Sequence, residues 1–240
     1  MHDDIPTAEN APTYRFLTQK DAQIATERGI PLEIANKIAE ADMLHEQGRL
    51  PEAEALYRQV LEHDPYEPIS LNQLGILKLN SGDPHEAVTL IRRALASEPN
   101  RAHMHYNLGV AFAQINEIEN AANAFDQALQ LDPEHALACS NLGTMLMLLN
   151  NTEAAKTAFL TAIRLKPDHA MSYANLGALL QQEGNAEDAR PILEHASKLD
   201  PNNLQCWSNL ADVLMSLGET DEAERCRARV EMIEKLARLN

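Results

Sequence analysis

Prolines recur along most of this chain at one fixed interval, and this periodicity constrains the fold more than any other feature. Successive members lie 34 residues apart, at Pro65, Pro99, Pro133, Pro167 and Pro201. A Leu-Gly pair repeats at the same interval, with its glycines at Gly75, Gly109, Gly143 and Gly177. A period of this length is typical of stacked helical hairpins, each of which buries its apolar face against its neighbours. The sequence therefore predicts an all-α solenoid.

The repeat frame divides the chain into a lead-in, a cap and a solenoid. Residues 1–13 are polar and contain two prolines, which predicts a disordered N-terminal lead-in. Residues 14–33 carry a short helical pattern, so we expect an N-terminal capping helix there. Residues 34–237 form the predicted solenoid of about six helix-turn-helix repeats, and 238–240 end the last, capping helix. The repeats are 34–67, 68–101, 102–135, 136–169, 170–203 and 204–237.

Two positions of the repeat have a backbone role. The eighth position holds the glycine of the Leu-Gly pair, where the lack of a side chain would let the second helix approach the first. The fifteenth position ends the first helix and holds Gly or Asn, the residues that best tolerate a left-handed backbone. It is filled by Gly48, Gly82, Asn116, Asn150, Gly184 and Gly218. This pattern predicts a left-handed turn between the two helices.

The second helix of each repeat has an apolar face built on a recurring alanine. The alanines are Ala53, Ala87, Ala121, Ala155, Ala189 and Ala223. A large apolar residue follows four positions later and a small one three beyond it, which places all of them on one helix face. Pro191 lies inside such a helix and predicts a slight kink. In the last repeat Arg227 takes the large apolar position and Lys235 replaces the proline, which indicates a terminal cap.

These motifs resemble the tetratricopeptide repeat. Its pattern is a large residue, Leu-Gly and another large apolar residue, followed by Ala, an aromatic residue, Ala and Pro. The fifth repeat carries Tyr173, Leu176, Gly177, Leu180, Ala189, Leu193, Ala196 and Pro201. The first repeat departs most, because Lys37 and Glu40 stand at the first large position and at the Leu. The resemblance implies a right-handed α-solenoid whose first helices line a concave groove, and a role in binding other proteins.

The charge balance bears on the choice of partner. The chain has 36 acidic and 20 basic residues, a formal net charge of −16. Such a field repels phosphate backbones and anionic lipid headgroups, so we expect no nucleic-acid partner and no membrane insertion. A neutral or basic extended segment of a protein or peptide is the partner that we predict. Alternatively, the charge only keeps an extended array soluble.

The cysteines and the N-terminus predict a reduced, cytoplasmic setting. Cys139, Cys206 and Cys226 form no CxxC pair, and Cys139 falls on the packing side of its helix, as a small core residue would. The first residues have neither a cationic start nor an apolar run, so they lack the pattern of a secretory signal.

Amide side chains recur at the sixth position of the repeat. They share a helix face with the second, ninth and thirteenth positions, away from the packing residues. An Asn offers a donor and an acceptor together, so a row of them could hold an extended peptide by its backbone. The row resembles the asparagine ladder in the repeat arm of O-linked N-acetylglucosamine transferase. The candidate peptide-binding residues are Gln73, Asn107, Asn141, Asn175, Asn209, Val110, Thr144 and Met171.

Other interpretations stay open at this point. The amides could bond between neighbouring repeats instead, and the apolar residues near them, such as Met147 and Met215, suit either a versatile ligand surface or ordinary packing. The chain could be a substrate-presenting or chaperone-like subunit of a separately encoded enzyme or secretion complex. It could also be a self-assembling scaffold, with a homo-oligomer formed through the groove or an end cap.

We find no pattern that predicts catalysis, a metal site or a cofactor. No nucleophile triad, phosphate-binding loop or paired-carboxylate motif stands out. His103 and His105 are two residues apart on one helix and therefore point in different directions. His135 and His169 fall in turns between repeats, where we expect them to be exposed. The sequence predicts a chain that is not an enzyme.

Overall fold

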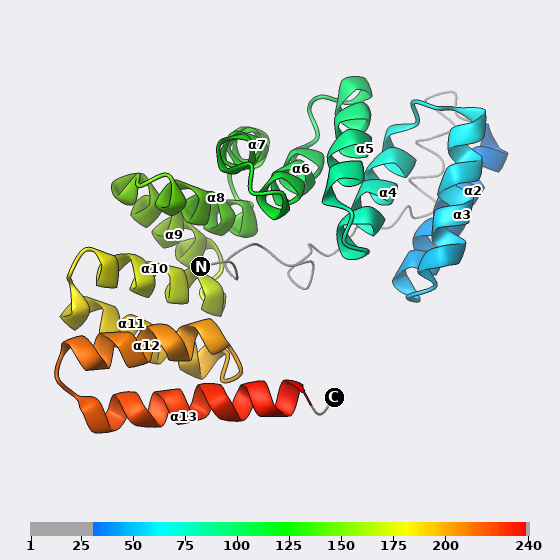
Figure 1. Ribbon diagram of the computed structural model, residues 1–240. Helices are drawn as coiled ribbons and strands as arrows, with labels where there is room; N and C mark the ends of the chain where they lie inside the picture. The colour runs from blue at the N-terminus through cyan, green and yellow to red at the C-terminus, as the bar shows by residue number, and fades with distance from the viewer. Residues whose placement is uncertain (1–30, 239–240) are drawn as a thin grey trace. The chain divides into compact units, whose positions relative to one another are not determined.

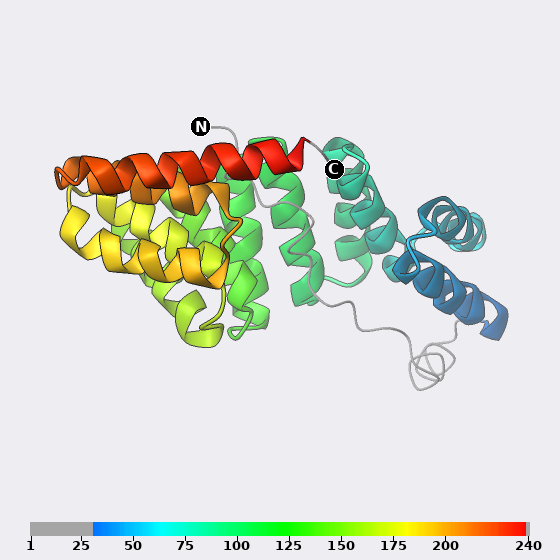
Figure 2. The ribbon, with the colours of Figure 1, turned by 90° about the horizontal axis from the view of Figure 1, so that it is seen from below.

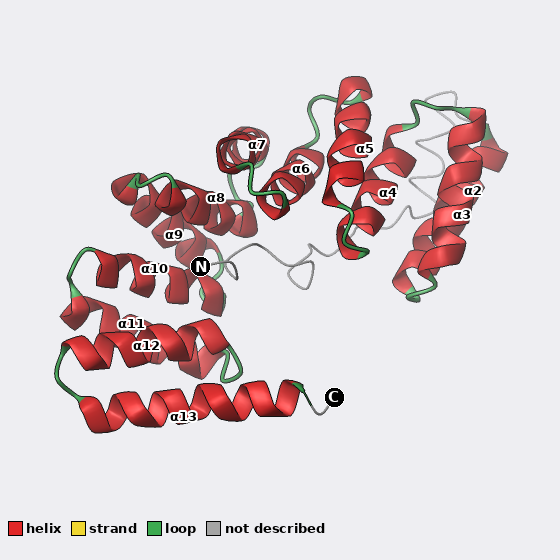
Figure 3. Cartoon of the chain, viewed as in Figure 1, coloured by secondary structure: helices red, strands yellow, loops and turns green. Residues whose placement is uncertain are grey.

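The computed structural model describes residues 31–238, which contain twelve helices and no strand (Figure 3). They form two compact parts, 31–133 and 134–238, which we call the N-terminal part and the C-terminal part. The N-terminal part holds α2 (Leu32–Glu46), α3 (Leu50–His63), α4 (Pro68–Asn80), α5 (Pro84–Ser97), α6 (Ala102–Gln114) and α7 (Ile118–Leu131). The C-terminal part holds α8 (Ala136–Leu148), α9 (Thr152–Leu165), α10 (Ala170–Gln182), α11 (Ala186–Leu199), α12 (Leu204–Ser216) and α13 (Thr220–Ala237).

The helices pair into consecutive hairpins, as the repeat frame predicts. Each first helix packs most closely on the second helix that follows it, from α2 with α3 to α12 with α13 (Figure 1). Each part is thus a stack of helical hairpins, the architecture of an α-solenoid. The expected lead-in at 1–13 and most of the expected cap at 14–33 lie outside the described residues. Leu32 and Glu33 belong to α2.

Several helices begin where the local sequence supplies a cap. Pro68 and Pro84 occupy the first turns of α4 and α5, where a missing N–H costs nothing. The Glu67 carboxylate accepts from the backbone N–H groups of Ile69 and Ser70 at 3.1 and 2.6 Å. The Asn203 side chain does the same at α12, accepting from the Cys206 N–H at 2.8 Å. Side chains therefore satisfy N–H groups that the start of a helix leaves without a partner.

The left-handed turn expected at the fifteenth position is confirmed. Asn116 and Asn150 have φ of 59° and 58°, and the four glycines at this position have φ between 73° and 81°. The backbone N–H of the next residue then bonds back into the first helix, for example from Glu117 to the Phe112 carbonyl at 2.9 Å. This bond closes the helix and sends the chain into the second helix.

The role predicted for the eighth position is also confirmed. A Cβ built on Gly143 would lie 2.6 Å from the ring of Phe159, and one on Gly109 would lie 2.6 Å from the ring of Phe125. Ile91 and Leu193 stand equally close to the other two glycines. All four large side chains are fully buried. The glycine therefore makes room for the residue that anchors the second helix.

First helices of successive repeats also touch each other within each part. In the N-terminal part α4 contacts α6, and in the C-terminal part α10 contacts both α8 and α12. Second helices make at most slight contacts with one another. Within each part the first helices therefore form the inner layer, and we call the side of this layer opposite the second helices the inner face.

The last repeat differs from the others. Helix α13 has 18 residues and extends past the end of α12, which Figures 1 and 2 both show. Arg227, at the position that is large and apolar elsewhere, is exposed. In the preceding repeat, α11 runs unbroken across Pro191.

Replacing Gly143 with Ala should destabilise the C-terminal part by about 1–3 kcal/mol, because the new methyl group overlaps the ring of Phe159. Gly82→Asn is the matched control. It adds a larger side chain at a turn glycine with open space around it, and Asn already adopts this conformation at Asn116. Urea denaturation followed by circular dichroism measures both. Equal midpoints for Gly143→Ala and the native chain would contradict the packing role.

Candidate peptide-binding face

The structure places the amide row on the first helices α4, α6, α8, α10 and α12. Gln73, Asn141 and Asn209 are half-buried. Asn107 and Asn175 are only 4% and 5% exposed. The row therefore lies partly on the inner face and partly between repeats, and the amides differ in how much they present to solvent.

In the N-terminal part the amides join a continuous hydrogen-bond chain. The Asn107 Nδ2 donates to Asn72 Oδ1 at 3.1 Å, and the Asn72 Nδ2 donates to Gln73 Oε1 at 3.5 Å. The Gln73 Nε2 then donates to Asp42 Oδ1 at 3.1 Å, and the same oxygen accepts from the Tyr57 hydroxyl at 2.5 Å. Every donor in this chain points toward the Asp42 carboxylate. We call these five residues the Asp42 chain.

Burial dominates the electrostatics of this carboxylate. The residues of the Asp42 chain give this carboxylate hydrogen bonds but no cation. Burial therefore raises the pKa of Asp42 above its ordinary value, and the hydrogen bonds from Tyr57 and Gln73 oppose this shift. Burial, together with the neighbouring Asp42 charge, also raises the pKa of Tyr57, which stays a hydroxyl donor. The sequence analysis did not select Asp42 and Asn72. Asp42 does stand at the ninth position, on the predicted face.

In the C-terminal part the amides also bridge repeats. The Asn175 Nδ2 donates to Thr144 Oγ1 at 3.0 Å, and the Thr144 hydroxyl donates to the Ser140 carbonyl at 3.2 Å. Asn209 differs, because its Oδ1 accepts from the Gln205 Nε2 of the same helix at 2.8 Å. Asn107 and Asn175 thus both donate a side-chain hydrogen bond to the preceding repeat. This is the bridging interpretation that the sequence left open beside peptide binding.

Two amide atoms of the C-terminal part are buried without a hydrogen-bond partner among the described residues. They are the Asn209 Nδ2 on α12 and the Gln181 Oε1 on α10. The other end of the Gln181 amide is held, because its Nε2 donates to Ser216 Oγ at 2.8 Å. An unpaired buried polar atom is costly, so a donor and an acceptor in this state mark a place where a ligand could pair with both.

The remaining candidate residues differ in how deeply they are buried. Val110 and Thr144 are buried and pack between helices, whereas Met171 is half-buried. Further along the inner layer, Leu148 and Met215 are exposed. The open apolar surface of the C-terminal part therefore comes from the second, twelfth and thirteenth positions of the repeat and not from the ninth.

The prediction that the two turn histidines are exposed was wrong. His169 was expected to be exposed in a turn, but it is buried at the start of α10. Its Nδ1 lies 2.7 Å from Ser172 Oγ, which donates to Ser140 Oγ at 3.0 Å. Burial and the nearby Lys166 charge lower the pKa of His169. His135 is half-buried, and its Nδ1 accepts from the Ala138 N–H at 3.2 Å. Both histidines therefore act in the turns as polar packing and capping groups.

The three cysteines are free and buried, as expected for Cys139. Burial raises the pKa of Cys206 to about 12, so it stays a thiol, and its Sγ lies 3.3 Å from the Leu193 carbonyl as a weak donor. No group of three or more His, Cys, Asp or Glu side chains is arranged to hold a metal ion within residues 31–238. In the same residues, no helix is both long and apolar enough for a membrane span.

Comparison with known families decides the identity of the repeats. The model of the cilia and flagella-associated protein 70 C-terminal domain, a tetratricopeptide-repeat family, matches residues 8–234. The chain belongs to this family. Tetratricopeptide-repeat arrays generally mediate protein–protein interaction, and the resemblance inferred from the Leu-Gly, Ala and Pro pattern is confirmed. No curated protein sequence gave a match.

Solved structures of tetratricopeptide-repeat proteins share the fold. PilF of Pseudomonas aeruginosa is 20% identical, with a TM-score of 0.71 over 85% of this chain and 91% of its own. MamA of Desulfovibrio magneticus RS-1 is 21% identical, with a TM-score of 0.63 over 70% of this chain and 96% of its own. YrrB, described as having an unusual peptide-binding site, is 18% identical, with a TM-score of 0.60 over 75% and 92%.

Replacing Asp42 with Asn should stabilise the N-terminal part near neutral pH, since Asn keeps an oxygen for Tyr57 and removes a buried charge. The pKa of Asp42 is higher in the folded chain than the ordinary value of 3.8 that applies to the unfolded chain. The carboxyl group therefore favours folding at pH values below 3.8, and this contribution is lost as the pH rises through the folded pKa. The advantage of the variant should therefore shrink on acidification.

Urea midpoints measured from neutrality to about pH 3 test this pH dependence. Glu62→Gln, which changes an exposed carboxylate on α3, is the control and should leave the midpoint nearly unchanged. A lower midpoint for Asp42→Asn at neutral pH would contradict the electrostatic argument.

Proposed function

We propose that this chain is a protein-interaction scaffold that binds an extended segment of a partner on the inner face of its first helices. The observation that carries this proposal is the unpaired donor and acceptor on α12 and α10, Asn209 Nδ2 and Gln181 Oε1. A peptide group offers the complementary acceptor and donor. The two atoms are buried, but each residue as a whole is only half-buried, so part of each side chain or backbone lies at the surface beside the unpaired atom.

The spacing of the two amides suits an extended chain. Gln181 is fixed by Ser216, which lies seven residues after Asn209 on α12. Seven residues of helix span roughly 10 Å. An extended segment rises about 3.3 Å per residue, so its carbonyl at Asn209 and its N–H at Gln181 would belong to residues about three apart. Binding through the backbone in this way would place little demand on the sequence of the partner.

Among the other amides of the row, some bridge repeats and others lie beside them on the proposed binding face. Asn107 and Asn175 each donate Nδ2 to the preceding repeat, which fixes the orientation of their carbonyl oxygens. Gln73 and Asn141 are half-buried and lie beside them on the inner layer. Bridging between repeats and peptide binding are therefore compatible, because the bridges hold the first helices in register for the ligand.

The side chains around the two amides indicate which kind of partner segment could bind there. Helices α6, α8, α10 and α12 contain neither Lys nor Arg, so a free carboxylate would find no cation there. Asp212 on α12 is exposed, and Met171, Leu148 and Met215 offer apolar contacts that adapt to different side chains. These features favour a neutral or basic segment with apolar residues.

The setting and the role follow from the same chemistry. Three free, buried thiols suit a reducing compartment, so we place the scaffold in the cytoplasm. Holding a segment by its backbone requires no reactive group, and we assign the chain no catalytic activity.

A photo-crosslinking residue at Met171 should capture partner segments, whereas the same residue at Leu160, which is exposed on α9 of the preceding repeat, should not. The reason is that Met171 lies on the first-helix layer and Leu160 on a second helix. Mass spectrometry of the crosslinked peptides from cell extract measures the difference. Equal capture at both positions would contradict binding on the inner face.

Asn209→Ala together with Gln181→Ala should weaken binding of a synthetic copy of the captured segment about ten-fold, because two hydrogen bonds are lost. Isothermal titration measures the affinity, and circular dichroism checks that helicity is unchanged. Thr157→Ala on α9 is the control and should bind like the native chain. Unchanged affinity of the double variant would exclude these two amides as the binding groups.

A further inference from the structure

The last helix carries a concentration of positive charge in an acidic chain. Residues 225–238 contain five of the 20 basic residues and only two of the 36 acidic ones. Arg225 and Lys235 are exposed and have no ion-pair partner among the described residues. The chain has a formal net charge of −16, so this segment stands out against the field of the rest.

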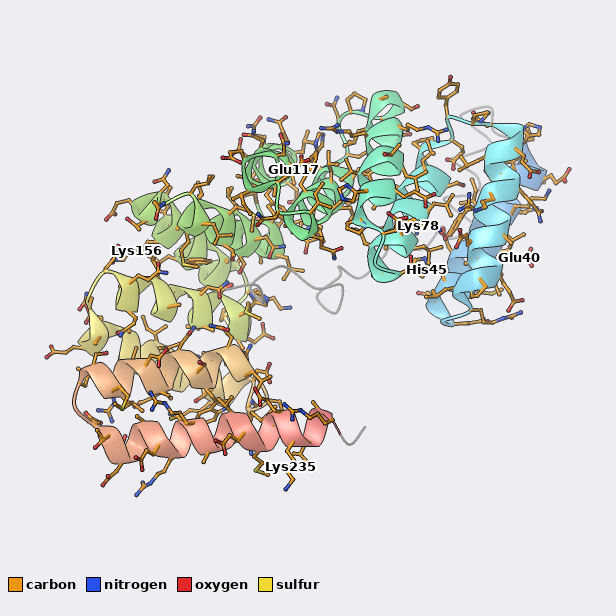
Figure 4. All side chains as sticks on the ribbon, in the orientation of Figure 1. Glu40, His45, Lys78, Glu117, Lys156 and Lys235 are labelled. Atoms are coloured by element: carbon orange, nitrogen blue, oxygen red, sulfur yellow. The ribbon has the colours of Figure 1, made fainter. Side chains whose placement is uncertain are left out.

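An exposed apolar strip accompanies these charges. Met232 and Leu236 are 51% and 50% exposed and lie one helical turn apart on α13. Arg225 lies seven residues before Met232, on the same face. The face that packs on the array is different and consists of Ala223, Cys226 and Ile233. Figure 4 shows Lys235 directed away from α12.

Helix α2, the first helix of the described residues, also has exposed apolar side chains, but the charges beside them are negative. Leu32 and Met43 are 59% and 47% exposed and lie eleven residues apart, on one face of α2. Glu40 and Glu46 flank this face, are exposed, and form no ion pair among the described residues. Ile34, Ile38 and Ala41 fill the buried side. Figure 4 shows Glu40 on the side of its hairpin turned away from α4.

We propose that the α13 face of one copy docks on the α2 face of a second copy, so that the chain assembles head to tail. The α13 face is formed by Arg225, Met232, Lys235 and Leu236, and the α2 face by Leu32, Glu40, Met43 and Glu46. Each face has two exposed apolar side chains with charges beside them, and the two sets of charges are of opposite sign. A second copy is the occupant because every copy carries both complementary faces.

The two faces are different surfaces, so their contact is heterologous. A heterologous contact leaves one unused face at each end of a dimer, and growth continues into open chains unless the rotation closes a ring. The polar surface around Arg227 does not oppose this assembly, because the docking strip lies on another side of α13. The proposed contact is independent of peptide binding on the inner face.

Sedimentation velocity of the full chain tests the proposal. At about 20 mM salt the native chain should sediment faster as its concentration rises from about 1 to about 200 µM, and at about 500 mM salt this rise should become much weaker through screening. A single concentration-independent monomer at low salt would overturn the proposal. In that case the α13 face would serve another acidic partner or none.

Two charge-reversed chains separate this contact from nonspecific attraction. Arg225→Glu with Lys235→Glu should move the midpoint of association to at least about ten-fold higher concentration, because acidic faces then oppose each other. Glu40→Lys with Glu46→Lys should do the same with basic faces. An equimolar mixture of the two variants should associate again, since each reversed face meets its complement on the other variant.

The control is Arg164→Glu with Lys198→Glu, which makes the same change of charge at exposed positions on α9 and α11. It should associate like the native chain. Circular dichroism confirms equal helicity throughout. The proposal fails if the control weakens association as much as the α13 variant, or if the mixture stays as dissociated as its components.

Discussion

The contact between a glycine on the first helix and a large side chain on the second determines how the four middle hairpins of residues 31–238 are built. Gly143 lets the ring of Phe159 lie where a methyl group would otherwise stand, and Ile91 and Leu193 use the same space in their repeats. Because each large residue is fully buried there, the second helix is held at a fixed depth against the first. The next hairpin packs on that pair, so the positions of the amides depend on it.

The sequence predicted the features that depend on the backbone of a single repeat. Only Gly and Asn adopt the left-handed turn readily, so Asn116 and Asn150 revealed the turn by standing where other repeats have Gly. The close contact at Gly109 was predictable in a similar way, since a glycine that recurs at one position of the repeat indicates a place where a side chain would not fit. Such local requirements leave a direct trace in residue type.

The polar contacts between repeats were less predictable. Helical periodicity assigns a residue to a face, but the depth of that residue depends on the side chains of the neighbouring hairpin. Asn107 lies on a first helix, as the repeat frame predicts, but it is only 4% exposed and its Nδ2 donates to Asn72 of the preceding repeat. His169 lies in a turn and is nevertheless buried; its ring contacts Ser172, which in turn donates to Ser140 of the preceding repeat. Neither partner could be identified from a single repeat.

The Asp42 chain has a consequence for how the N-terminal part opens. Apolar packing in a repeat array links only adjacent hairpins, so a terminal hairpin with few motif residues tends to fray on its own. Here Tyr57 and Asp42 of the first hairpin are tied through Gln73 and Asn72 to Asn107 of the third. Detaching α2 would strip the acceptor from Gln73 and leave its donor unpaired. We therefore expect the three hairpins to unfold as one cooperative block. In hydrogen exchange, the backbone amides of all three would then be protected to the same extent, and those of the first hairpin would not exchange faster.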